Sequence, residues 1–423
     1  MGKPEIRFKG YTDEWEQRKL GELVKEGILE APLDGNHGEK HPTSDEYVES
    51  GIPFLMASDI HNGEVNIYSC KYITKERAER LDKGFARNGD VLLTHKATIG
   101  ETAILSNLMT EYAMLTPQVT YYRIKNEERL NREYLYSFFN SLDFQTELKT
   151  KAAQSTRPYI GITAQQNLKI ILPTEIDEQR KIGLYFGNLD RLITLHQRKC
   201  EQTKKLKKYM LQKMFPQNGA KVPEIRFDGF TYDWEQRKLS EIAIEKLSNG
   251  IMNNQANDET GLRHINVINM YELDKIHPEK LTFSNYDEDA VKKCNVEWGD
   301  IFLTRSSLKP EGIAESNVLL DSGRFVYDDH LIRLKLDKEK YDPFFVKLNL
   351  SGSIFKRQFI ARAKTTAFTT IGQEDIAECF GLFPEKEEQE KIGTYFSNLD
   401  HLITLHQRHT DFYKKTSCYF ISS

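Results

Sequence analysis

The sequence has no run of about 18 uninterrupted apolar residues, the length that a membrane-spanning helix requires. Its first residues, MGKPEIRFKGYTDEW, lack the apolar segment of a signal peptide. Cysteine is scarce: five residues, at 70, 200, 294, 379 and 418, are scattered, without the close spacing of a zinc site or the even number of a disulfide framework. These absences predict a protein of the reducing cytoplasm that has no membrane association.

Motifs for catalysis are also missing. The chain has no GxxxxGK[ST] phosphate loop, no GxGxxG after a strand, no GxSxG elbow and no HExxH. His37 and His41 bracket Glu39, but Gly35 and Gly38 around them favour a loop. The run DPFF at 342–345 is similar to a methyltransferase catalytic loop but lacks its second proline, so it is interpreted as a helix start. The sequence therefore predicts no catalytic residue, no cofactor-binding residue and no metal ligand.

What the chain does contain is a long internal repeat. KIGLYFGNLDRLITLHQR at Lys181–Arg198 returns at Lys391–Arg408, with an offset of 210 and identity at 15 of 18 positions. Apolar residues recur at spacings of four, three and four, which is the stripe of an amphipathic helix. We expect eight side chains to pack these two helices together: Ile182, Phe186, Leu189 and Ile193, and Ile392, Phe396, Leu399 and Ile403.

Other framework segments are doubled as well. PEIRFKGYTDEWEQRKL at Pro4–Leu20 matches Pro223–Leu239 at 13 of 17 positions, whereas spans 21–88 and 240–298 share almost nothing. Gly-Asp turns at 89–90 and 299–300 each precede a β-branched and apolar strand. Amphipathic helices are expected at 131–150 and 343–361, followed by polar loops and a last strand.

These repeats predict an α+β chain of two similar mixed α/β domains, at 1–173 and 217–384. Two long helices, at 174–216 and 385–423, would separate the domains and pack as an antiparallel coiled coil with pseudo-twofold symmetry. The acidic start after each proline, 173 and 384, suits a helix N-terminus. The alternative is that each helix folds back onto its own domain.

Candidate recognition residues lie in the polar loops where the two halves diverge. The net charge is −4, but residues 191–213 hold eight basic residues and one acid, so charge sum alone excludes no nucleic-acid partner. Short polar and basic side chains are those that meet base edges and phosphates. The predicted nucleic-acid contacts are Thr94, His95, Lys96, Thr98, Gln154, Ser155, Thr156, Arg157 and Tyr159 in the first half, and Thr304, Arg305, Ser306, Ser307, Lys309, Arg362, Lys364, Thr365 and Thr366 in the second.

In its doubled PEIRF…WEQRKL openings, Gly-Asp strands and proline–Glu-Gln–helix segments, the chain resembles the specificity subunits of type I restriction–modification systems. The resemblance covers essentially the whole chain. It implies a non-catalytic subunit whose two target recognition domains each read one half of a bipartite double-stranded DNA site, while the helices set the spacer.

The same resemblance implies partners for the chain. The helices would dock two modification subunits that methylate adenine with S-adenosylmethionine, and ATP- and magnesium-dependent restriction subunits would add cleavage. One departure is the second helix, which ends TSCYFISS where the first reads KLKKYMLQKMF; we expect weaker packing or docking there. The alternatives are a stand-alone DNA methyltransferase or nuclease, and a scaffold whose loops bind proteins.

Overall fold

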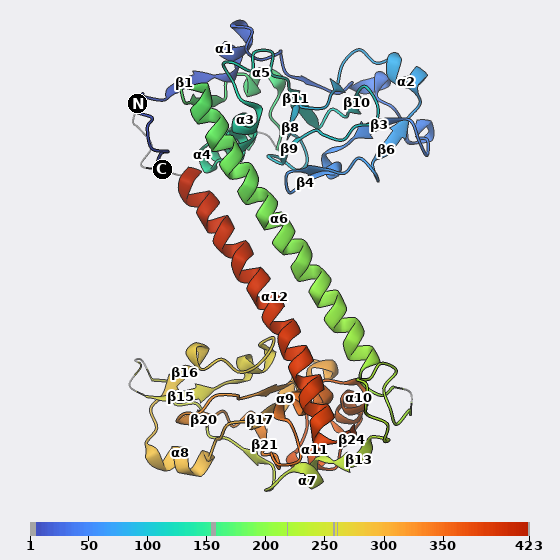
Figure 1. The fold of residues 1–423 in the computed structure, drawn as a ribbon, viewed down its shortest axis with the longest axis vertical. Helices are drawn as coiled ribbons and strands as arrows, with labels where there is room; N and C mark the ends of the chain where they lie inside the picture. Colours follow the sequence, from blue (N-terminus) through green and yellow to red (C-terminus); the bar gives the residue numbers. More distant parts are fainter. Residues whose placement is uncertain (1–5, 154–157, 218, 257–258, 260, 422–423) are drawn as a thin grey trace. The chain divides into compact units, whose positions relative to one another are not determined.

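The computed structural model describes residues 6–153, 158–217, 219–256, 259 and 261–421, with side chains described to residue 416. The chain divides into two compact units. Unit 1 comprises Met1–Arg198 with Gln407–Ser423, and unit 2 comprises Lys199–His406. Two long helices, α6 (Ile176–Lys213) and α12 (Lys386–Ile421), each contribute a segment to both units (Figure 1).

Unit 1 is a mixed α/β domain joined to the start of α6. Its strands are β1 (Glu16–Lys19), β2 (Leu33–Asp34), β3 (Ile52–Leu55), β4 (Ile60–His61), β5 (Glu64–Val65), β6 (Lys71–Ile73), β7 (Phe85–Ala86), β8 (Val91–Thr94), β9 (Thr102–Ile104), β10 (Ala113–Leu115), β11 (Val119–Tyr122) and β12 (Lys169–Leu172). Its shorter helices are α1 (Leu20–Lys25), α2 (Lys75–Glu79), α3 (Arg132–Phe139), α4 (Leu142–Ala152) and α5 (Ile162–Gln165).

Unit 2 has a closely related set of elements around the start of α12. Its strands are β13 (Glu235–Lys238), β14 (Ser248–Asn249), β15 (Leu262–Ile265), β16 (Thr282–Ser284), β17 (Ile301–Thr304), β18 (Ser306–Ser307), β19 (Ser316–Val318), β20 (Phe325–Tyr327), β21 (Leu331–Leu334), β22 (Lys364–Thr365), β23 (Thr369–Thr370) and β24 (Phe380–Phe383). Its shorter helices are α7 (Leu239–Ile242), α8 (Glu288–Cys294), α9 (Pro343–Leu350), α10 (Ser353–Arg362) and α11 (Gln373–Ala377).

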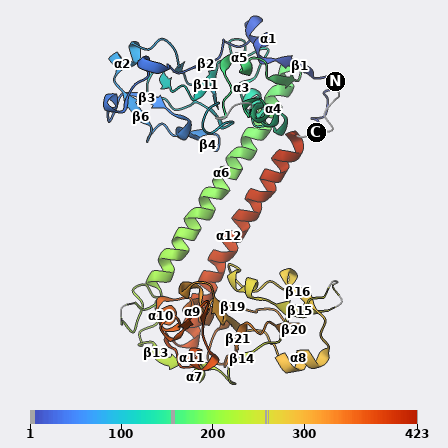
Figure 2. The same cartoon turned by 180° about the vertical axis from the view of Figure 1, so that it is seen from behind.

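The two units share one sheet topology. The order β2-β11-β8-β9 in unit 1 corresponds to β14-β21-β17-β19 in unit 2, and β6-β3-β10 corresponds to β16-β15-β20. The pairs β3–β10 and β15–β20 are both parallel. In unit 2, α9, α10 and α11 lie beside the start of α12, whereas β15, β16 and α8 lie on the other side of the unit (Figure 2). The predicted duplication of an α+β domain is therefore confirmed, even across spans that share almost no sequence.

The helices predicted at 131–150 and 343–361 are each two helices in the structure, so this part of the prediction was wrong. In unit 1 the break follows Phe139, and the Ser141 side chain caps α4 by accepting a bond from the Phe144 backbone N–H at 3.2 Å. The rings of Phe139 and Phe144 stack across the break, with centroids 4.4 Å apart. Both rings are buried, so the kink lets consecutive helices point aromatic side chains into one core.

The repeated opening segments act as clamps on the long helices. Arg7 donates two bonds to the Glu178 carboxylate in the first turn of α6, at 2.6 and 2.8 Å. Arg226 does the same to Glu388 in the first turn of α12, at 2.7 and 2.8 Å. Both glutamates are fully buried, and bidentate Arg–carboxylate pairs are among the stronger hydrogen-bonded contacts. The repeat is thus explained by the attachment of each helix to its own domain.

The glutamine after each of these glutamates makes a second attachment. The Gln179 side-chain oxygen accepts a bond from the backbone N–H of Asn131, which caps α3, at 3.0 Å. Gln389 accepts from the backbone N–H of Asp342, which caps α9, at 3.1 Å. The helix start predicted for the DPFF run is therefore confirmed, and Asp342 has a structural role.

A glycine in each repeat allows close contact between helices. A Cβ atom on Gly183 would lie 2.6 Å from the backbone nitrogen of Tyr134 in α3, which is shorter than real contacts allow. A Cβ atom on Gly187, one turn further along α6, would meet nothing within 4 Å. The two glycines of one helix therefore serve different purposes.

We expect Gly183→Ala to destabilise unit 1 by about 1–3 kcal/mol, because overpacking forces the backbone of α3 to move. Gly187→Ala is the matched control and should stabilise the helix by about 0.5–1 kcal/mol through its higher helix propensity. Calorimetric melting of both variants checks this. Equal shifts of the two melting temperatures would contradict the close-contact explanation.

The long helices pack against each other in an antiparallel sense. Within unit 2, Lys207 Nζ lies 2.5 Å from Asp400 Oδ1, and Cys200 Sγ lies 3.9 Å from the Ile403 carbonyl oxygen. Residue numbers rise along α6 as they fall along α12, which defines the antiparallel pairing. Within unit 1, the ring of His196 lies 4.7 Å from that of His409.

Residues of the predicted apolar stripe pack against the cores of the two units. Ile392, Phe396 and Leu399 belong to the core cluster of unit 2, and Ile182 packs against the core of unit 1. Stripe residues therefore join each helix to its own domain. Within the described part of the chain, none of the helices combines the length and the apolar character that crossing a bilayer demands.

Candidate nucleic-acid interface

In both units the residue that follows the Gly-Asp strand bonds through its backbone to two other segments of the chain. We call this set of backbone bonds the junction. In unit 1 the His95 backbone N–H donates to the Gln118 carbonyl at 2.9 Å, and the His95 carbonyl accepts from Ile160 at 3.2 Å. In unit 2 the Arg305 N–H donates to the His330 carbonyl at 2.9 Å, and its carbonyl accepts from Ile371 at 3.0 Å. The same main-chain framework thus presents different side chains in the two units.

These junctions bring together loops that are far apart in the sequence. In unit 2, β18, β23 and β22 form a small antiparallel sheet that joins the two predicted segments, 304–309 and 362–366. In unit 1, Lys96 and Tyr159 form an antiparallel bridge between the corresponding segments. In each unit the two predicted segments are therefore joined through backbone pairing.

Most of the predicted contact residues that the structure describes are accessible at these surfaces. Ser306 and Ser307 are partly buried. The exposed residues are Lys96, Thr98 and Tyr159 in unit 1, and Arg305, Lys309, Arg362, Lys364, Thr365 and Thr366 in unit 2. The predicted residues Gln154, Ser155, Thr156 and Arg157 lie outside the described residues.

Three predicted contact residues are buried, and their side chains serve the protein itself. The hydroxyl of Thr94 accepts from the Glu101 backbone N–H at 2.9 Å, and that of Thr304 accepts from Glu315 at 3.0 Å. The His95 ring donates through Nδ1 to the Ile160 carbonyl at 3.0 Å. These side chains are buried and do not reach a ligand directly, so we assign Thr94, His95 and Thr304 to support of the loops.

Burial gives His95 an unusual acidity. Loss of hydration lowers the pKa of His95 from 6.5 to about 4, although Asp34, with a carboxylate oxygen 4.0 Å from the ring, opposes this shift. His95 is therefore neutral at physiological pH. Its ring contacts that of Tyr159, with centroids 5.6 Å apart, so protonation would disturb the exposed loop.

We expect unit 1 to lose stability on acidification through this residue. Between pH 6.5 and about 4 the unfolded state binds the His95 proton and the folded state does not, so stability falls as pH falls, by about 3 kcal/mol at pH 4. His95→Gln keeps a donor near Ile160 and should remove this component of the pH dependence. Urea unfolding at pH 7, 5 and 4 measures it, with Lys96→Gln as the control. Parallel pH profiles for wild type and His95→Gln would contradict the assignment.

Sequence reasoning missed four residues at these surfaces. Gln118 and His330 occupy the same junction position, and His330 is exposed. Leu308 and Phe368 flank the small sheet of unit 2 and are 81% and 54% exposed. The signal for the first pair was available, because each of these residues begins a run of β-branched, aromatic or apolar residues that is typical of a strand, at 118–124 and 330–336. The apolar pair gave no signal, since only the fold leaves Leu308 and Phe368 without cover.

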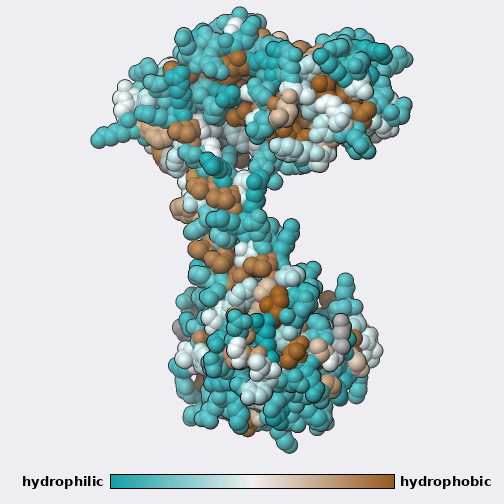
Figure 3. Space-filling view, turned by 45° about the vertical axis from the view of Figure 1, so that its right-hand side comes forward, coloured by the Kyte–Doolittle hydropathy of each residue, from teal (hydrophilic) through white to brown (hydrophobic). Residues whose placement is uncertain are grey.

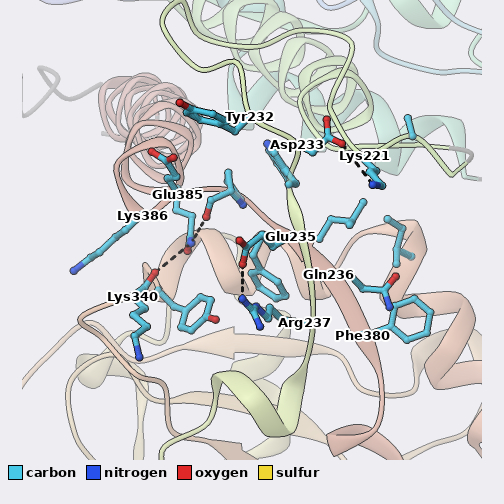
Figure 4. A pocket seen from close by; sticks show the side chains of 18 of the residues that line it. Lys221, Tyr232, Asp233, Glu235, Gln236, Arg237, Lys340, Phe380, Glu385 and Lys386 are labelled. Carbon is cyan, nitrogen blue, oxygen red and sulfur yellow. Dashed lines mark hydrogen bonds and ion pairs between the residues drawn. The ribbon is translucent and has the colours of Figure 1, made fainter.

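A separate groove in unit 2 is built from framework residues and not from these loops (Figure 4). It is lined by β13, the end of β24 and the start of α12. Four of its charged groups form two pairs: Arg237 with Glu235 at 2.5 Å, and Lys221 with Asp233 at 3.5 Å. No activated nucleophile or acid–base pair is found among its described residues. One framework that presents two different surfaces is typical of a recognition protein.

The comparisons with known proteins agree. Residues 12–205 match the model of the type I restriction modification DNA specificity domain. The MjaX specificity subunit of Methanocaldococcus jannaschii is 23% identical over 415 residues, covering 94% of this chain and 89% of that protein. The MjaVIII specificity subunit of the same organism is 25% identical over 203 residues, covering 47% of this chain and 45% of that protein.

A solved structure shows the same fold. The S subunit of the type I restriction–modification system from M. genitalium aligns with a TM-score of 0.64 and 12% identity, covering 99% of this chain and 97% of that one. Residues 12–205 thus match the type I restriction modification DNA specificity domain, and nearly the whole chain is similar in sequence to the MjaX specificity subunit and in fold to the M. genitalium S subunit.

Proposed function

We propose that the chain is the DNA-reading subunit of a type I restriction–modification complex, and that each unit reads one half of a bipartite site in double-stranded DNA. In this proposal residues 1–173 and 217–384 are the target recognition domains. Residues 174–216 and 385–423 are the helices that set the unread spacer. The chain itself carries out no methyl transfer or cleavage.

The observation that carries the proposal is the repeated junction with different side chains. The Gln118 position of unit 1 holds His330 in unit 2, and the His95 position, where the ring is buried in unit 1, holds the exposed Arg305 in unit 2. Hydrogen bonding to base edges depends on the donors and acceptors presented, so one framework with two side-chain sets reads two sequences. The exposed basic side chains of Lys96, Arg305 and Lys364 would supply contacts to phosphates or base edges.

The long helices are proposed to dock two modification subunits. Apolar side chains stay exposed along both helices (Figure 3). Leu184, Leu195 and Phe412 are 64%, 44% and 63% exposed in unit 1, and Leu206 and Leu402 are 45% and 41% exposed in unit 2. Exposed apolar surface of this kind marks protein interaction sites. S-adenosylmethionine would be held by the modification subunits, and ATP and magnesium by restriction subunits, in the cytoplasm.

We expect Arg305→Ala and Lys364→Ala to weaken DNA binding by the complex of this chain with its modification subunits. Loss of a base contact by Arg305 would cost about 1–3 kcal/mol of binding free energy and relax specificity at one position. Loss of a phosphate contact by Lys364 would lower the slope of the logarithm of the binding constant against the logarithm of the salt concentration by about 1. Binding titrations at several salt concentrations check both. Arg324→Ala is the control, because Arg324 pairs with Glu288 of α8. DNA binding by the complex that is insensitive to salt and to both substitutions would favour a protein-binding scaffold.

A further inference from the structure

The turn between β20 and β21 in unit 2 gathers three potential metal ligands. One ligand atom from each of Asp328, Asp329 and His330 lies within 4.8 Å of the other two. His330 Nδ1 lies 2.9 Å from Asp328 Oδ1 and 3.0 Å from Asp329 Oδ1. Acidic residues in an exposed turn are common, so this cluster alone would carry no conclusion.

A fourth side chain approaches the cluster from inside the domain. His264 in β15 has no exposed surface, and its Nδ1 lies 2.5 Å from Ser284 Oγ. Its Nε2 is buried and has no hydrogen-bond partner, and it lies 3.8 Å from Asp328 Oδ2. An imidazole nitrogen that has no hydrogen-bond partner is a good metal ligand.

Unit 1 provides an internal comparison. The position that corresponds to His264 in the parallel strand pair holds Phe54, which is 1% exposed. The turn that corresponds to 328–330 reads Thr116-Pro117-Gln118, which has no carboxylate and no imidazole. An apolar ring is the ordinary occupant of this core position. An imidazole with one nitrogen unpaired there costs stability unless something binds that nitrogen.

We propose that His264, Asp328, Asp329 and His330 form a binding site for a divalent transition-metal ion of the zinc class. Zinc binds imidazole and carboxylate at about 2.0–2.2 Å in a tetrahedron, which places ligand atoms about 3–4 Å apart. The separations of 2.9, 3.0 and 3.8 Å fall near this range. Two imidazoles and two carboxylates suit zinc better than calcium or magnesium, which prefer oxygen ligands only.

The site would stabilise the recognition surface of unit 2. The His330 carbonyl accepts the Arg305 backbone N–H, so an ion held by His330 would fix the start of the loop that carries Arg305. The ion would join β15 to this loop. Its role is structural, and it extends the proposed function without depending on it, because metal binding is measured without DNA.

Zinc binding by the purified full chain tests the proposal. After chelator dialysis, competition of zinc against a chromophoric chelator should give one tight equivalent for the wild type. Cobalt in its place should give the visible absorption of a tetrahedral ion. His264→Phe, which installs the unit 1 residue, and Asp328→Asn should each lower affinity by at least about a hundredfold.

Two further variants keep the outcome decisive. His330→Ala changes an exposed side chain and should lose affinity without loss of fold, which circular dichroism verifies. His37→Ala alters the histidine loop of unit 1 and should leave zinc binding unchanged. No tight equivalent in the wild type, or wild-type affinity in both His264→Phe and His330→Ala, would overturn the proposal and leave an internal His–Asp contact only.

Discussion

Replacing residues 21–168 by residues 240–379 of the same chain should give a subunit whose two recognition domains read the same half-site. The exchange leaves β1, β12 and the Arg7–Glu178 clamp native. The incoming segment contains Asp342. Its backbone N–H donates to Gln389 in unit 2, as the backbone N–H of Asn131 donates to Gln179 in unit 1. The exchanged domain is therefore expected to attach to α6 as the native one does.

The effect on recognition should be large. A mismatched base pair costs about 1–3 kcal/mol, so a half-site with several changed base pairs shifts the preference on the order of a thousandfold or more. Methylome sequencing of a host with this subunit and its partners measures the result: both methylated half-sites should be the one read by unit 2. The reciprocal exchange, 21–168 into unit 2, is the matched control. Persistence of the original first half-site would contradict the assignment of one half-site to each unit.

Arg123→Leu should destabilise unit 1 by about 3–5 kcal/mol, because it leaves the buried carboxylate of Asp90 without its cation. Arg123 donates to Asp90 at 2.9 and 2.7 Å, and Asp90 is 2% exposed. Arg123 also donates to the Phe85 carbonyl at 2.8 Å. Asp90→Asn in the same background should recover part of the loss, since it removes the unpaired charge.

Hydrogen exchange of β8 and β11 measures this change for unit 1 alone, which is preferable for a chain of two units. Arg129→Leu is the matched control. Arg129 pairs with Glu26 at 3.1 Å, but both side chains are exposed, so this change should cost no more than about 0.5 kcal/mol. Similar losses in the two arginine variants would show that burial of Asp90 does not decide the outcome.

The paired Gly-Asp turns explain why this motif is detectable in the sequence. Gly89 and Gly299 adopt φ of +97° and +86°, where residues with a side chain are strained. Asp90 and Asp300 accept backbone N–H bonds from Arg87 and Glu297, at 2.7 and 3.0 Å. Such requirements are local, so they appear in the sequence itself.

The sequence by itself determined the duplication, the two long helices and the position of the polar loops after the Gly-Asp strands. Those features depend on periodicity, turns and caps, which act over a few residues. The tertiary structure alone decided which loops meet: β18, β23 and β22 join residues more than 50 positions apart. It also decided that Thr94, His95 and Thr304 are buried, and that His264 lies beside Asp328. Burial and long-range contact depend on how whole sheets pack, and no short pattern of residues specifies that packing.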